Sequence, residues 1–389
     1  MIGQGVICRG YIESLLAAGA RIRTTDIDPG NNRGHRDLRY DSLARTNFHG
    51  CSRRLGVLVT GAVGMPPNWR GEYWRRRLGV STMALNVWRE LDTLPPEALE
   101  ALASFDALLA STHFIAEVMQ RHLPRTPVLY CPFPLQVPDV APMARDRFAL
   151  PPDAVLVLIA FDPASDVERK NPFAAVEAFR RAAERDPKLH LLVKINNPRQ
   201  GHDPFAGMTA RMQAAVADHS RIRLLDETLS EADNLALLKA ADIYLSLHRA
   251  EGLGLGMLES MHLGRAVVAT GYSGNLSFMD EKSACLVPFK KIPAGGQNTP
   301  APAAPPGGPT WAEPEVDAAA GWLVELARNP GLRASLGEAA VAAARRYSAE
   351  AERLEAFVAL SRLTPVWQLR DDLQRATRRV LKRLRLVHD

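Results

Sequence analysis

The sequence has no long apolar run and few cysteines. No stretch of about 18 apolar residues occurs, so no helix is expected to cross a membrane. The first five residues, MIGQG, lead into a helical pattern and lack the basic and then apolar run of a secretory signal peptide. The cysteines match no metal-binding or redox spacing, since Cys8, Cys51, Cys131 and Cys285 lie far apart. These absences favour a cytoplasmic protein with reduced, buried cysteines.

What the chain does have is the length and composition of a two-domain globular protein. Its 389 residues are too many for one typical core. Hydrophobic residues make up 47% and charged residues 23%, which is ordinary for this class. The net charge of +5 and the pI near 9.1 suit an anionic ligand or a membrane surface, but many proteins with neither partner share such values.

The second half of the sequence alternates short apolar runs with helical segments. The run over 155–161 has no helical period and predicts a buried strand, and 171–184 predicts an amphipathic helix. Further strands are predicted at 189–195, 222–225, 243–247 and 266–270, and helices at 229–240, 255–263, 316–328 and 331–344. This alternation indicates a parallel sheet covered on both faces, in which ligands bind beyond the carboxyl ends of the strands.

The first third is less regular. The patterns predict helices over 5–19, 96–103 and 113–122, and strands over 21–25, 55–59, 82–87, 107–110 and 128–131. A cluster of prolines marks a domain boundary near 136–150. We therefore predict an α/β protein with an N-terminal domain over 1–140, a C-terminal domain over 141–350 and a final segment over 351–389. The Pro- and Gly-rich stretch 292–310 is expected to be a surface insert of the second domain.

A glycine-rich turn follows the strand predicted at 243–247. Residues 248–259 read HRAEGLGLGMLE. Glycines let a backbone approach a ligand closely, and the N-terminus of the following helix offers free N–H groups and a positive dipole end that suit a diphosphate. Glu251 precedes this helix, and Glu259 lies about two turns inside it, where a carboxylate can accept paired hydrogen bonds from a ribose diol. The alternative is a plain strand–helix turn with two solvated glutamates, but two carboxylates that bracket the turn favour a binding site.

The segment from Ser246 to Asn275 resembles the retaining, glycogen-synthase-like glycosyltransferases of the GT-B fold. The matching features are the Glu-x7-Glu pair Glu251 and Glu259, then Gly264 and the apolar stretch RAVVAT. The branch found in polysaccharide and lipopolysaccharide assembly is matched by GYSGN at 271–275, FD at 161–162, RKNP at 169–172 and WAEPEVD at 311–317. The resemblance is most specific over 155–350 and weaker over 1–135, where WRE at 88–90, LP at 94–95 and STHF at 111–114 still fit.

This resemblance implies two Rossmann-like domains whose parallel sheets face each other across a cleft. The N-terminal domain would hold the acceptor, and the C-terminal domain would hold the nucleotide sugar. The family begins with a strand and a glycine-rich turn before its first helix, whereas this sequence begins at the turn. The N-terminal domain is therefore expected to lack its first strand, which would leave a gap in its sheet.

The resemblance also implies roles for individual residues. Lys170 and Arg169 would neutralise the donor diphosphate, because bond cleavage puts negative charge on the leaving nucleotide. Cations at a helix start are otherwise unfavourable, so a bound anion explains them better than solvation does. Glu251, with Lys170 as the second catalytic residue, would contact the donor sugar. The remaining donor-binding residues are predicted to be Arg169, Lys194, His248, Gly252, Gly254, Leu255, Glu259 and Asn275.

The sequence offers weaker signals for the acceptor and for metals. Glu90 and His113 are acceptor-side candidates, although each also fits an ion pair or a helix cap. His248 fits a structural role almost as well as donor contact. Asp26-Ile27-Asp28 has the Asp-x-Asp form that binds a metal in the other large glycosyltransferase fold, but its position before Pro29 favours a turn. We expect no metal and no cofactor, since the nucleotide sugar is a substrate.

The segment 365–389 is basic, with seven Lys and Arg against three Asp, and its apolar residues recur at near-helical spacing. Such a helix lies on an anionic membrane or packs against its own protein, and the sequence leaves both open. Membrane contact would suit a lipid-linked acceptor and a peripheral position on the inner membrane face. Nucleic-acid binding rests on this segment alone and is not expected.

The sequence thus predicts a retaining glycosyltransferase of family 4 type, which moves a hexose-like sugar from a nucleoside diphosphate to a glycan or lipid-linked acceptor. One alternative is a GT-B nucleotide-sugar epimerase, and another is a non-catalytic donor-binding or scaffold homologue. The Glu-x7-Glu pair and the Ser-Gly-Asn at 273–275 favour transfer over epimerisation.

Overall fold

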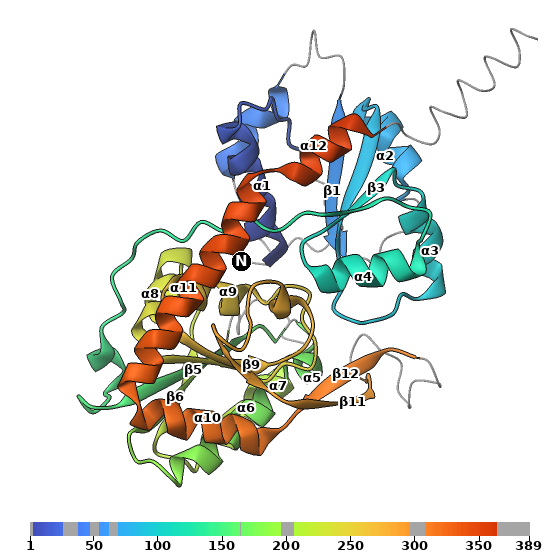
Figure 1. Cartoon of the computed structure of the whole chain (residues 1–389). Helices are drawn as coiled ribbons and strands as arrows, with labels where there is room; N and C mark the ends of the chain where they lie inside the picture. The colour runs from blue at the N-terminus through green and yellow to red at the C-terminus, as the bar shows by residue number, and fades with distance from the viewer. Residues whose placement is uncertain are drawn as a thin grey trace, which may run out of the picture.

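Two parallel β-sheets organise the chain (Figure 1). The structure, a computed structural model, describes residues 3–25, 38–46, 54–61, 69–163, 165–195, 206–295 and 308–363. One sheet lies in the upper half of the view in Figure 1 and the other in the lower half. Helix α11 (Pro330–Glu352) runs along both halves and leads into α12 (Glu355–Arg362), which packs against the upper sheet.

The N-terminal half holds a sheet of four strands in the order β1-β2-β3-β4, with every pair parallel. Its elements are α1 (Gly3–Ala17), the 3-10 helix η1 (Leu38–Arg45), β1 (Leu55–Gly61), α2 (Gly71–Leu78), β2 (Thr82–Trp88), α3 (Pro96–Ala103), β3 (Ala107–Ala110), α4 (His113–His122) and β4 (Val128–Tyr130). Strands β2 and β3 are buried along their whole length. Alternate residues of β2 pack on both sides, Leu85 toward Trp74 of α2 and Ala84 in the core that includes Tyr11 of α1, which is why these strands are apolar throughout.

The C-terminal half holds a sheet of six strands in the order β10-β9-β8-β5-β6-β7, and these pairs are also parallel. Its elements are the 3-10 helix η2 (Arg145–Phe148), β5 (Val155–Phe161), α5 (Val167–Lys170), α6 (Pro172–Ala183), β6 (Leu189–Ile195), α7 (Ala206–Val216), β7 (Ile222–Asp226), α8 (Glu231–Ala240), β8 (Ile243–Ser246), α9 (Leu255–His262), β9 (Ala266–Thr270), the 3-10 helix η3 (Gly274–Ser277), β10 (Cys285–Val287) and α10 (Val316–Arg328). Strands β11 (Phe289–Pro293) and β12 (Thr310–Pro314) form a separate antiparallel hairpin.

The strand order of this second sheet indicates where a ligand is expected to bind. From β5 the chain moves outward to β6 and β7, then returns to the other side of β5 and continues through β8, β9 and β10. The connections therefore leave β5 and β8 in opposite directions, and in open sheets of this kind ligands bind at the carboxyl ends of two such strands, a place called the crevice below. The segments that follow these two strands are α5 and the glycine-rich turn.

Most of the predicted elements are confirmed. The bounds of β5, β6, β9, α3, β3, α4 and α10 agree with the sequence prediction, and several others differ by one or two residues. The strand predicted at 21–25 is wrong, because these residues have no strand structure and pair with no neighbour among the described residues. A strand exists only through such pairing, which an apolar pattern cannot guarantee. In the described part of the chain, α1 comes first and all four strands of its sheet follow it.

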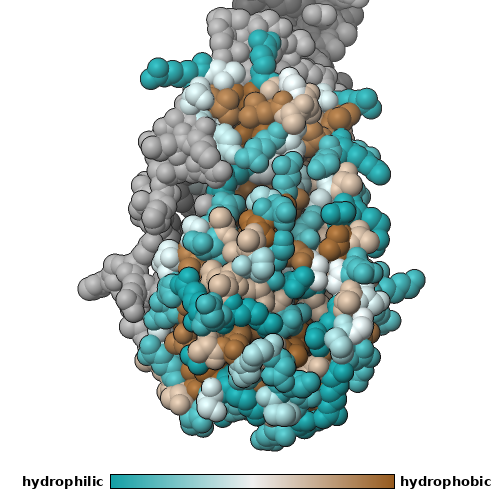
Figure 2. Space-filling view, turned by 90° about the vertical axis from the view of Figure 1, so that its left-hand side faces the viewer, coloured by the Kyte–Doolittle hydropathy of each residue, from teal (hydrophilic) through white to brown (hydrophobic). Residues whose placement is uncertain are grey.

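The described surface is mostly polar. Figure 2 shows hydrophilic residues over most of one face, with a hydrophobic patch toward the end that belongs to the N-terminal half. The exposed large hydrophobic residues are Leu16, Tyr73, Leu276 and Val358. Among the described helices, none is both long and apolar enough to span a bilayer. The predicted basic helix at 365–389 and most of the insert 292–310 lie outside the described residues.

Three cysteines can be placed, and each carries a free thiol. Cys131 and Cys285 are buried, as predicted, and burial raises the pKa of each thiol to about 12. The prediction is wrong for Cys8, which is only half-buried because it lies on the partly exposed side of α1. Cys51 lies outside the described residues.

Candidate active site

Helix α5 carries two cations to the carboxyl end of β5. Asp166 caps this short helix, and its carboxylate accepts a hydrogen bond from the amide of Arg169 at 3.3 Å. Asn171 ends the helix in the left-handed conformation, with φ of 52°, and Pro172 then starts α6. This sharp change of direction leaves Arg169 and Lys170 at the crevice.

Glu251 lies opposite these cations, in the turn that follows β8. Its carboxylate forms a short hydrogen-bonded ion pair with Lys170 Nζ, and its other oxygen lies 3.4 Å from Arg169 Nη1. Glu251 is only 7% exposed, and burial alone would raise its pKa. The charges of Lys170 and Arg169 outweigh burial and lower the pKa to about 2, so this carboxylate is ionised at neutral pH.

Arg169 joins the two segments and also faces the N-terminal half. Its Nη1 donates a hydrogen bond of 2.7 Å to the carbonyl oxygen of Ala250, directly before Glu251. Its Nη2 lies 4.0 Å from the carboxylate of Glu90, which follows β2 in the other half. Two cations and two carboxylates from three separate segments therefore meet at this crevice.

The glycine-rich turn is shaped by close backbone packing. Gly254 caps α9 with φ of 89°, a conformation that strains residues with a side chain. A Cβ atom at Gly274 would lie 2.1 Å from the carbonyl oxygen of Gly252, so only glycine permits the 271–275 loop to pack this closely. The amides of Gly254, Leu255 and Gly256 donate no hydrogen bond to any group that the structure describes. The start of α9 can therefore bind an anion.

Ser273 holds this turn in place, a role that the sequence analysis did not assign. Its Oγ accepts a hydrogen bond of 2.8 Å from the amide of Glu251 and donates one of 2.5 Å to the carbonyl oxygen of Tyr272. Ser273 also has φ of 77°, which is strained for a non-glycine residue. The only sequence signal for it was its place in the Ser-Gly-Asn stretch.

Glu259 lies on α9 and has a different environment from Glu251. Its carboxylate has no hydrogen-bond or ion-pair partner within the described ranges, and it is only partly buried. Burial and the nearby charge of Glu231 raise its pKa to about 8. An unpaired carboxyl group beside the turn is available to hydroxyl groups of a ligand.

His248 and Asn275, both predicted to bind the donor, are fully buried and bonded to each other. His248 Nε2 lies 3.1 Å from Asn275 Oδ1, and Asn275 Nδ2 donates to the carbonyl oxygen of Thr270 at 3.0 Å. Burial lowers the pKa of His248, which favours the neutral ring. These contacts join the ends of β8 and β9, and direct donor contact by either residue stays a prediction.

Lys194, also predicted to bind the donor, is 1% exposed at the end of β6. Its ammonium group donates to the carbonyl oxygens of Ile195, at 2.8 Å, and Glu227. Burial lowers its pKa to about 8. The structure gives it no contact with Lys170 or Glu251, so its role in binding stays a prediction.

The N-terminal half meets the glycine-rich turn directly. Thr112 Oγ1 donates to the carbonyl oxygen of Gly252 at 2.9 Å. The amide of His113, an acceptor-side candidate, donates to Ser277 Oγ at 3.0 Å, and its exposed ring stacks on Tyr130 with centroids 4.1 Å apart. Glu90, the other candidate, faces Arg169 as described above. Both candidates thus lie where the two halves meet.

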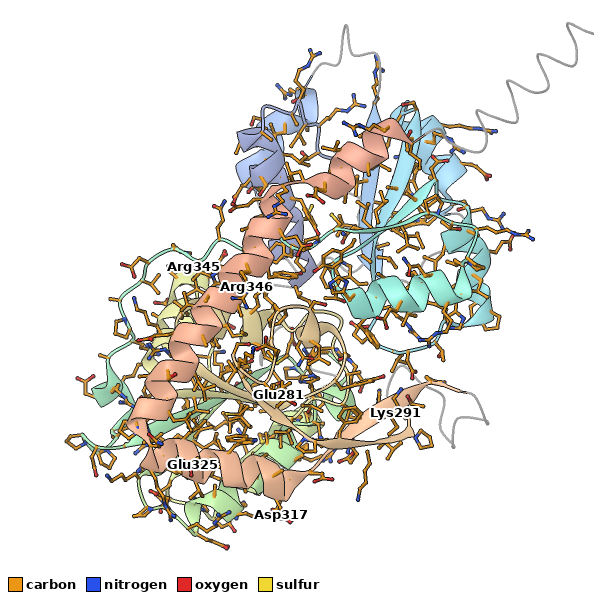
Figure 3. All side chains as sticks on the ribbon, in the orientation of Figure 1. Glu281, Lys291, Asp317, Glu325, Arg345 and Arg346 are labelled. Atoms are coloured by element: carbon orange, nitrogen blue, oxygen red, sulfur yellow. The ribbon has the colours of Figure 1, made fainter. Side chains whose placement is uncertain are left out.

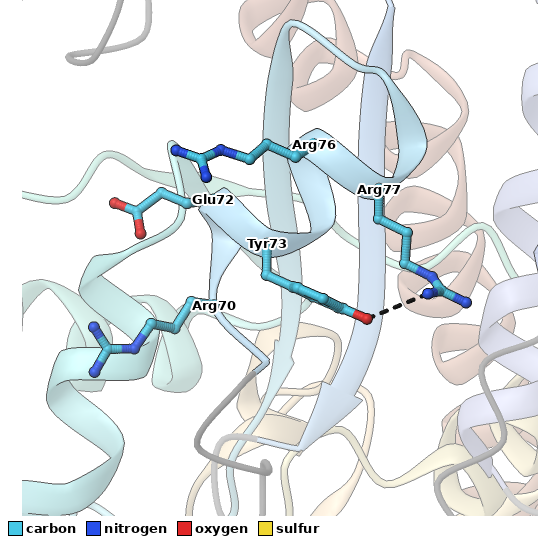
Figure 4. A pocket seen from close by; sticks show the side chains of 5 residues that line it. All are labelled: Arg70, Glu72, Tyr73, Arg76 and Arg77. Carbon is cyan, nitrogen blue, oxygen red and sulfur yellow. Dashed lines mark hydrogen bonds between the residues drawn. The ribbon is translucent and has the colours of Figure 1, made fainter.

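A separate hollow of about 510 Å³ lies on the outer surface of α2 (Figure 4). It is lined by Arg70, Glu72, Tyr73, Arg76 and Arg77. Arg70 is paired with Glu100 at 2.6 Å, and Arg77 donates to the Tyr73 hydroxyl at 3.3 Å. The hollow shares no residue with the Glu251 cluster and brings together no group placed for catalysis.

Among the residues that the structure describes, no group of three or more His, Cys, Asp or Glu residues could hold a metal ion. Asp26 and Asp28, the residues of the Asp-x-Asp sequence, lie outside the described residues.

Comparisons with known proteins bear on this arrangement. Residues 159–295, which include α5, the glycine-rich turn and Glu259, match the family model described as glycosyl transferases group 1. A comparison with curated proteins finds no match.

Solved structures with the same arrangement include several glycosyltransferases. A variant of S. aureus TarM in complex with fondaparinux, alpha-GlcNAc-glycerol and UDP is 14% identical, with a TM-score of 0.51, over 72% of this chain and 50% of that one. Anabaena HepE in complex with UDP and glucose is 13% identical, with a TM-score of 0.53, over 71% of each chain. A glycosyltransferase from Rickettsia africae is 12% identical, with a TM-score of 0.54, over 75% of this chain and 78% of that one.

This chain therefore spans about half the length of TarM. At these identities the likeness concerns the fold, and it shows the two Rossmann-like halves with parallel sheets of GT-B glycosyltransferases. The match to glycosyl transferases group 1 covers residues 159–295, which is less than half of the chain.

Proposed function

We propose that this protein is a retaining glycosyltransferase that moves a sugar from a nucleoside diphosphate to a glycan or lipid-linked acceptor. One observation carries this proposal. Glu251 is held ionised by Lys170 and Arg169 at the crevice between β5 and β8, beside the free amides of α9. These groups lie in the segment that matches glycosyl transferases group 1.

The donor diphosphate would bind between the cations and the start of α9. When the bond from the anomeric carbon to the phosphate oxygen breaks, its electron pair stays on the leaving nucleotide. Fixed positive charges of Lys170 and Arg169, with the amides of the turn, stabilise that developing charge more strongly in a buried site than in water. The Lys170–Glu251 ion pair of the free protein supports this placement, because it fixes the ammonium group before the donor arrives.

The two glutamates would then have separate tasks. Glu251, ionised and buried, would accept hydrogen bonds from hydroxyl groups of the donor sugar. Glu259, unpaired on α9, would accept those of the ribose, and Glu90 and His113 would border the acceptor. The acceptor hydroxyl would attack the anomeric carbon from the side that the nucleotide leaves, and its proton would be transferred to a base or water. This step retains the anomeric configuration, as expected for enzymes of family 4 type.

A UDP-sugar is the donor class that we would test first. The TarM and HepE structures are complexes that contain UDP, and both share this fold. We further propose metal-independent catalysis, a cytoplasmic location with peripheral contact at the inner membrane face, and a role in polysaccharide or lipopolysaccharide assembly.

The deciding experiment measures nucleotide release and thermal stabilisation with UDP-, GDP-, ADP- and dTDP-sugars, with and without EDTA. We expect EDTA-insensitive release from one donor, lost in Glu251→Ala and reduced roughly 100-fold or more in Lys170→Gln. Glu325→Ala, on the exposed side of α10, is the matched control and should retain wild-type release.

The other outcomes separate the alternatives. A donor that stabilises the protein without nucleotide release would indicate a binding or scaffold protein. Conversion of the donor into an epimer, again without release, would indicate an epimerase. No response to any donor would remove the proposed site.

A further inference from the structure

Arg249 lies two residues before Glu251 and is bonded to the segments on both sides of it. Its amide donates a hydrogen bond of 2.7 Å to the carbonyl oxygen of Arg169 at the end of α5. Its carbonyl oxygen accepts one of 2.9 Å from the amide of Ala312 in β12. The backbone of Arg249 thus lies between the helix that carries the cations and the β11–β12 hairpin.

The side chain of Arg249 also contacts both α5 and β12. Its Nε donates to Glu313 Oε2 of β12 at 2.5 Å. Its Nη1 donates to the carbonyl oxygen of Glu168 in α5 at 2.9 Å and lies 3.4 Å from the carboxylate of the same residue. The guanidinium also lies over the ring of buried Trp311, 5.6 Å from its centroid. A planar guanidinium has enough donors in fixed directions to make all these contacts at once, which a lysine ammonium group does not.

The hairpin that Arg249 contacts is itself anchored to the N-terminal half. Asp92, in the loop after β2, accepts a hydrogen bond of 2.8 Å from the amide of Thr310 and lies 3.5 Å from Lys291 Nζ. Figure 3 shows Lys291 on the hairpin, on the side toward the N-terminal half. The β11–β12 hairpin is therefore held to the N-terminal half by Asp92, and Arg249 connects the hairpin to the turn that carries Glu251.

We propose that Arg249 is a positioning residue that holds the Glu251 turn against α5, so that Glu251 and Lys170 keep the relative position in which they meet the donor. The side chain of Arg249 makes four contacts with three residues, Glu168, Trp311 and Glu313, and none of these contacts involves the Glu251 carboxylate or the Lys170 ammonium group. It acts through the backbone on either side of it. Glu313 acts through Arg249, because it accepts the shortest of these hydrogen bonds.

This inference rests on the proposed glycosyl transfer, and its test begins with the donor that the wild type turns over. We expect Arg249→Gln to lower kcat by about 10- to 100-fold, because a displacement of about 1 Å in a catalytic group is enough for such a loss. The KM for the donor should change less than about threefold, since Arg249 makes no proposed donor contact and differential loss in the transition state appears in kcat. Glu313→Gln should give a smaller decrease in kcat, and the double variant should be no slower than Arg249→Gln alone.

The matched control is Arg181→Gln, which removes an arginine that is paired with Glu177 and Asp317 at the surface. Thermal unfolding of every variant separates positioning from loss of fold, and Glu313→Gln supplies the same test with a milder change. An unchanged kcat in Arg249→Gln, or a decrease equal to that of Arg181→Gln, would overturn the inference. So would additive effects of the Arg249 and Glu313 changes. Failure of the proposed function looks different, because the wild type itself would then release no nucleotide.

Discussion

The hydroxyl group of Thr112 donates a hydrogen bond of 2.9 Å to the carbonyl oxygen of Gly252, across the boundary between the two halves. The same oxygen of Thr112 accepts the amide of Ile115 at 3.3 Å and so caps α4. One buried side chain therefore starts a helix of the N-terminal half and holds the glycine-rich turn of the other half.

Replacement of Thr112 should be costly for this reason. Thr112→Val leaves the amide of Ile115 and the carbonyl oxygen of Gly252 without a partner, and we expect the free energy of unfolding to fall by about 1–3 kcal/mol. Thr112→Ser keeps the hydroxyl group and should lose less. Chemical denaturation of the three proteins measures this, and equal losses for valine and serine would show that the hydroxyl group contributes nothing.

Gly274→Ala should disturb the donor turn. The new Cβ would lie 2.1 Å from the carbonyl oxygen of Gly252, and neither backbone can move without displacing the other. We expect a loss of about 1–3 kcal/mol in the free energy of unfolding from overpacking, and nucleotide binding weaker by about tenfold or more. Gly271→Ala is the control, because its Cβ would meet its nearest atoms at an ordinary 3.5 Å. Denaturation and nucleotide titration would contradict the prediction if the two variants behaved alike.

Glu259 should make stability depend on pH. Its pKa is raised from 4.5 to about 8, so the folded protein binds this proton more tightly than the unfolded chain does. The stabilisation that comes from this tighter proton binding is complete below the pKa of Glu259 in the unfolded chain, and it is lost as pH rises toward 8. Glu251, with its pKa lowered to about 2, has the opposite effect on the pH dependence of stability. The stabilisation from its ionised carboxylate is lost only as pH falls through the acid range.

The measurement compares Tm from pH 5 to 9 in the wild type and in Glu259→Gln. The Tm of the wild type should fall relative to that of the variant by about 2 °C or more over this range. Parallel curves would mean that the Glu259 carboxyl group titrates normally.

Asp92 should be needed to hold the β11–β12 hairpin to the N-terminal half. Asp92→Ala removes the acceptor of the Thr310 amide and the partner of Lys291, and we expect a loss of about 1–3 kcal/mol. Lys291→Gln removes the exposed ion pair at 3.5 Å and the contact of the ammonium group with the Tyr272 ring, 5.3 Å from its centroid, and should lose about 1 kcal/mol or less. Amide exchange in 289–293 and 310–314 should accelerate in the alanine variant alone, and unchanged exchange there would contradict this anchoring role.

The sequence by itself determined the local elements of the second half and the residues that make up its glycine-rich turn. Strand β5 is apolar at almost every position because it is buried on both faces, and this pattern needs no knowledge of the neighbouring strands. The glycine-rich turn between Glu251 and Glu259 could also be recognised without knowledge of neighbouring elements, because close approach of a backbone requires glycine.

Only the tertiary structure decided which of these groups meet. Lys170 and Glu251 are 81 positions apart, and they pair because the sheet order places β8 next to β5. The same packing turns His248 and Asn275 inward, gives Arg249 partners on both α5 and β12, and leaves 21–25 without a strand neighbour among the described residues. Sequence periodicity describes one element and its own two faces, whereas ion pairs, strand pairing and burial depend on elements distant in the chain.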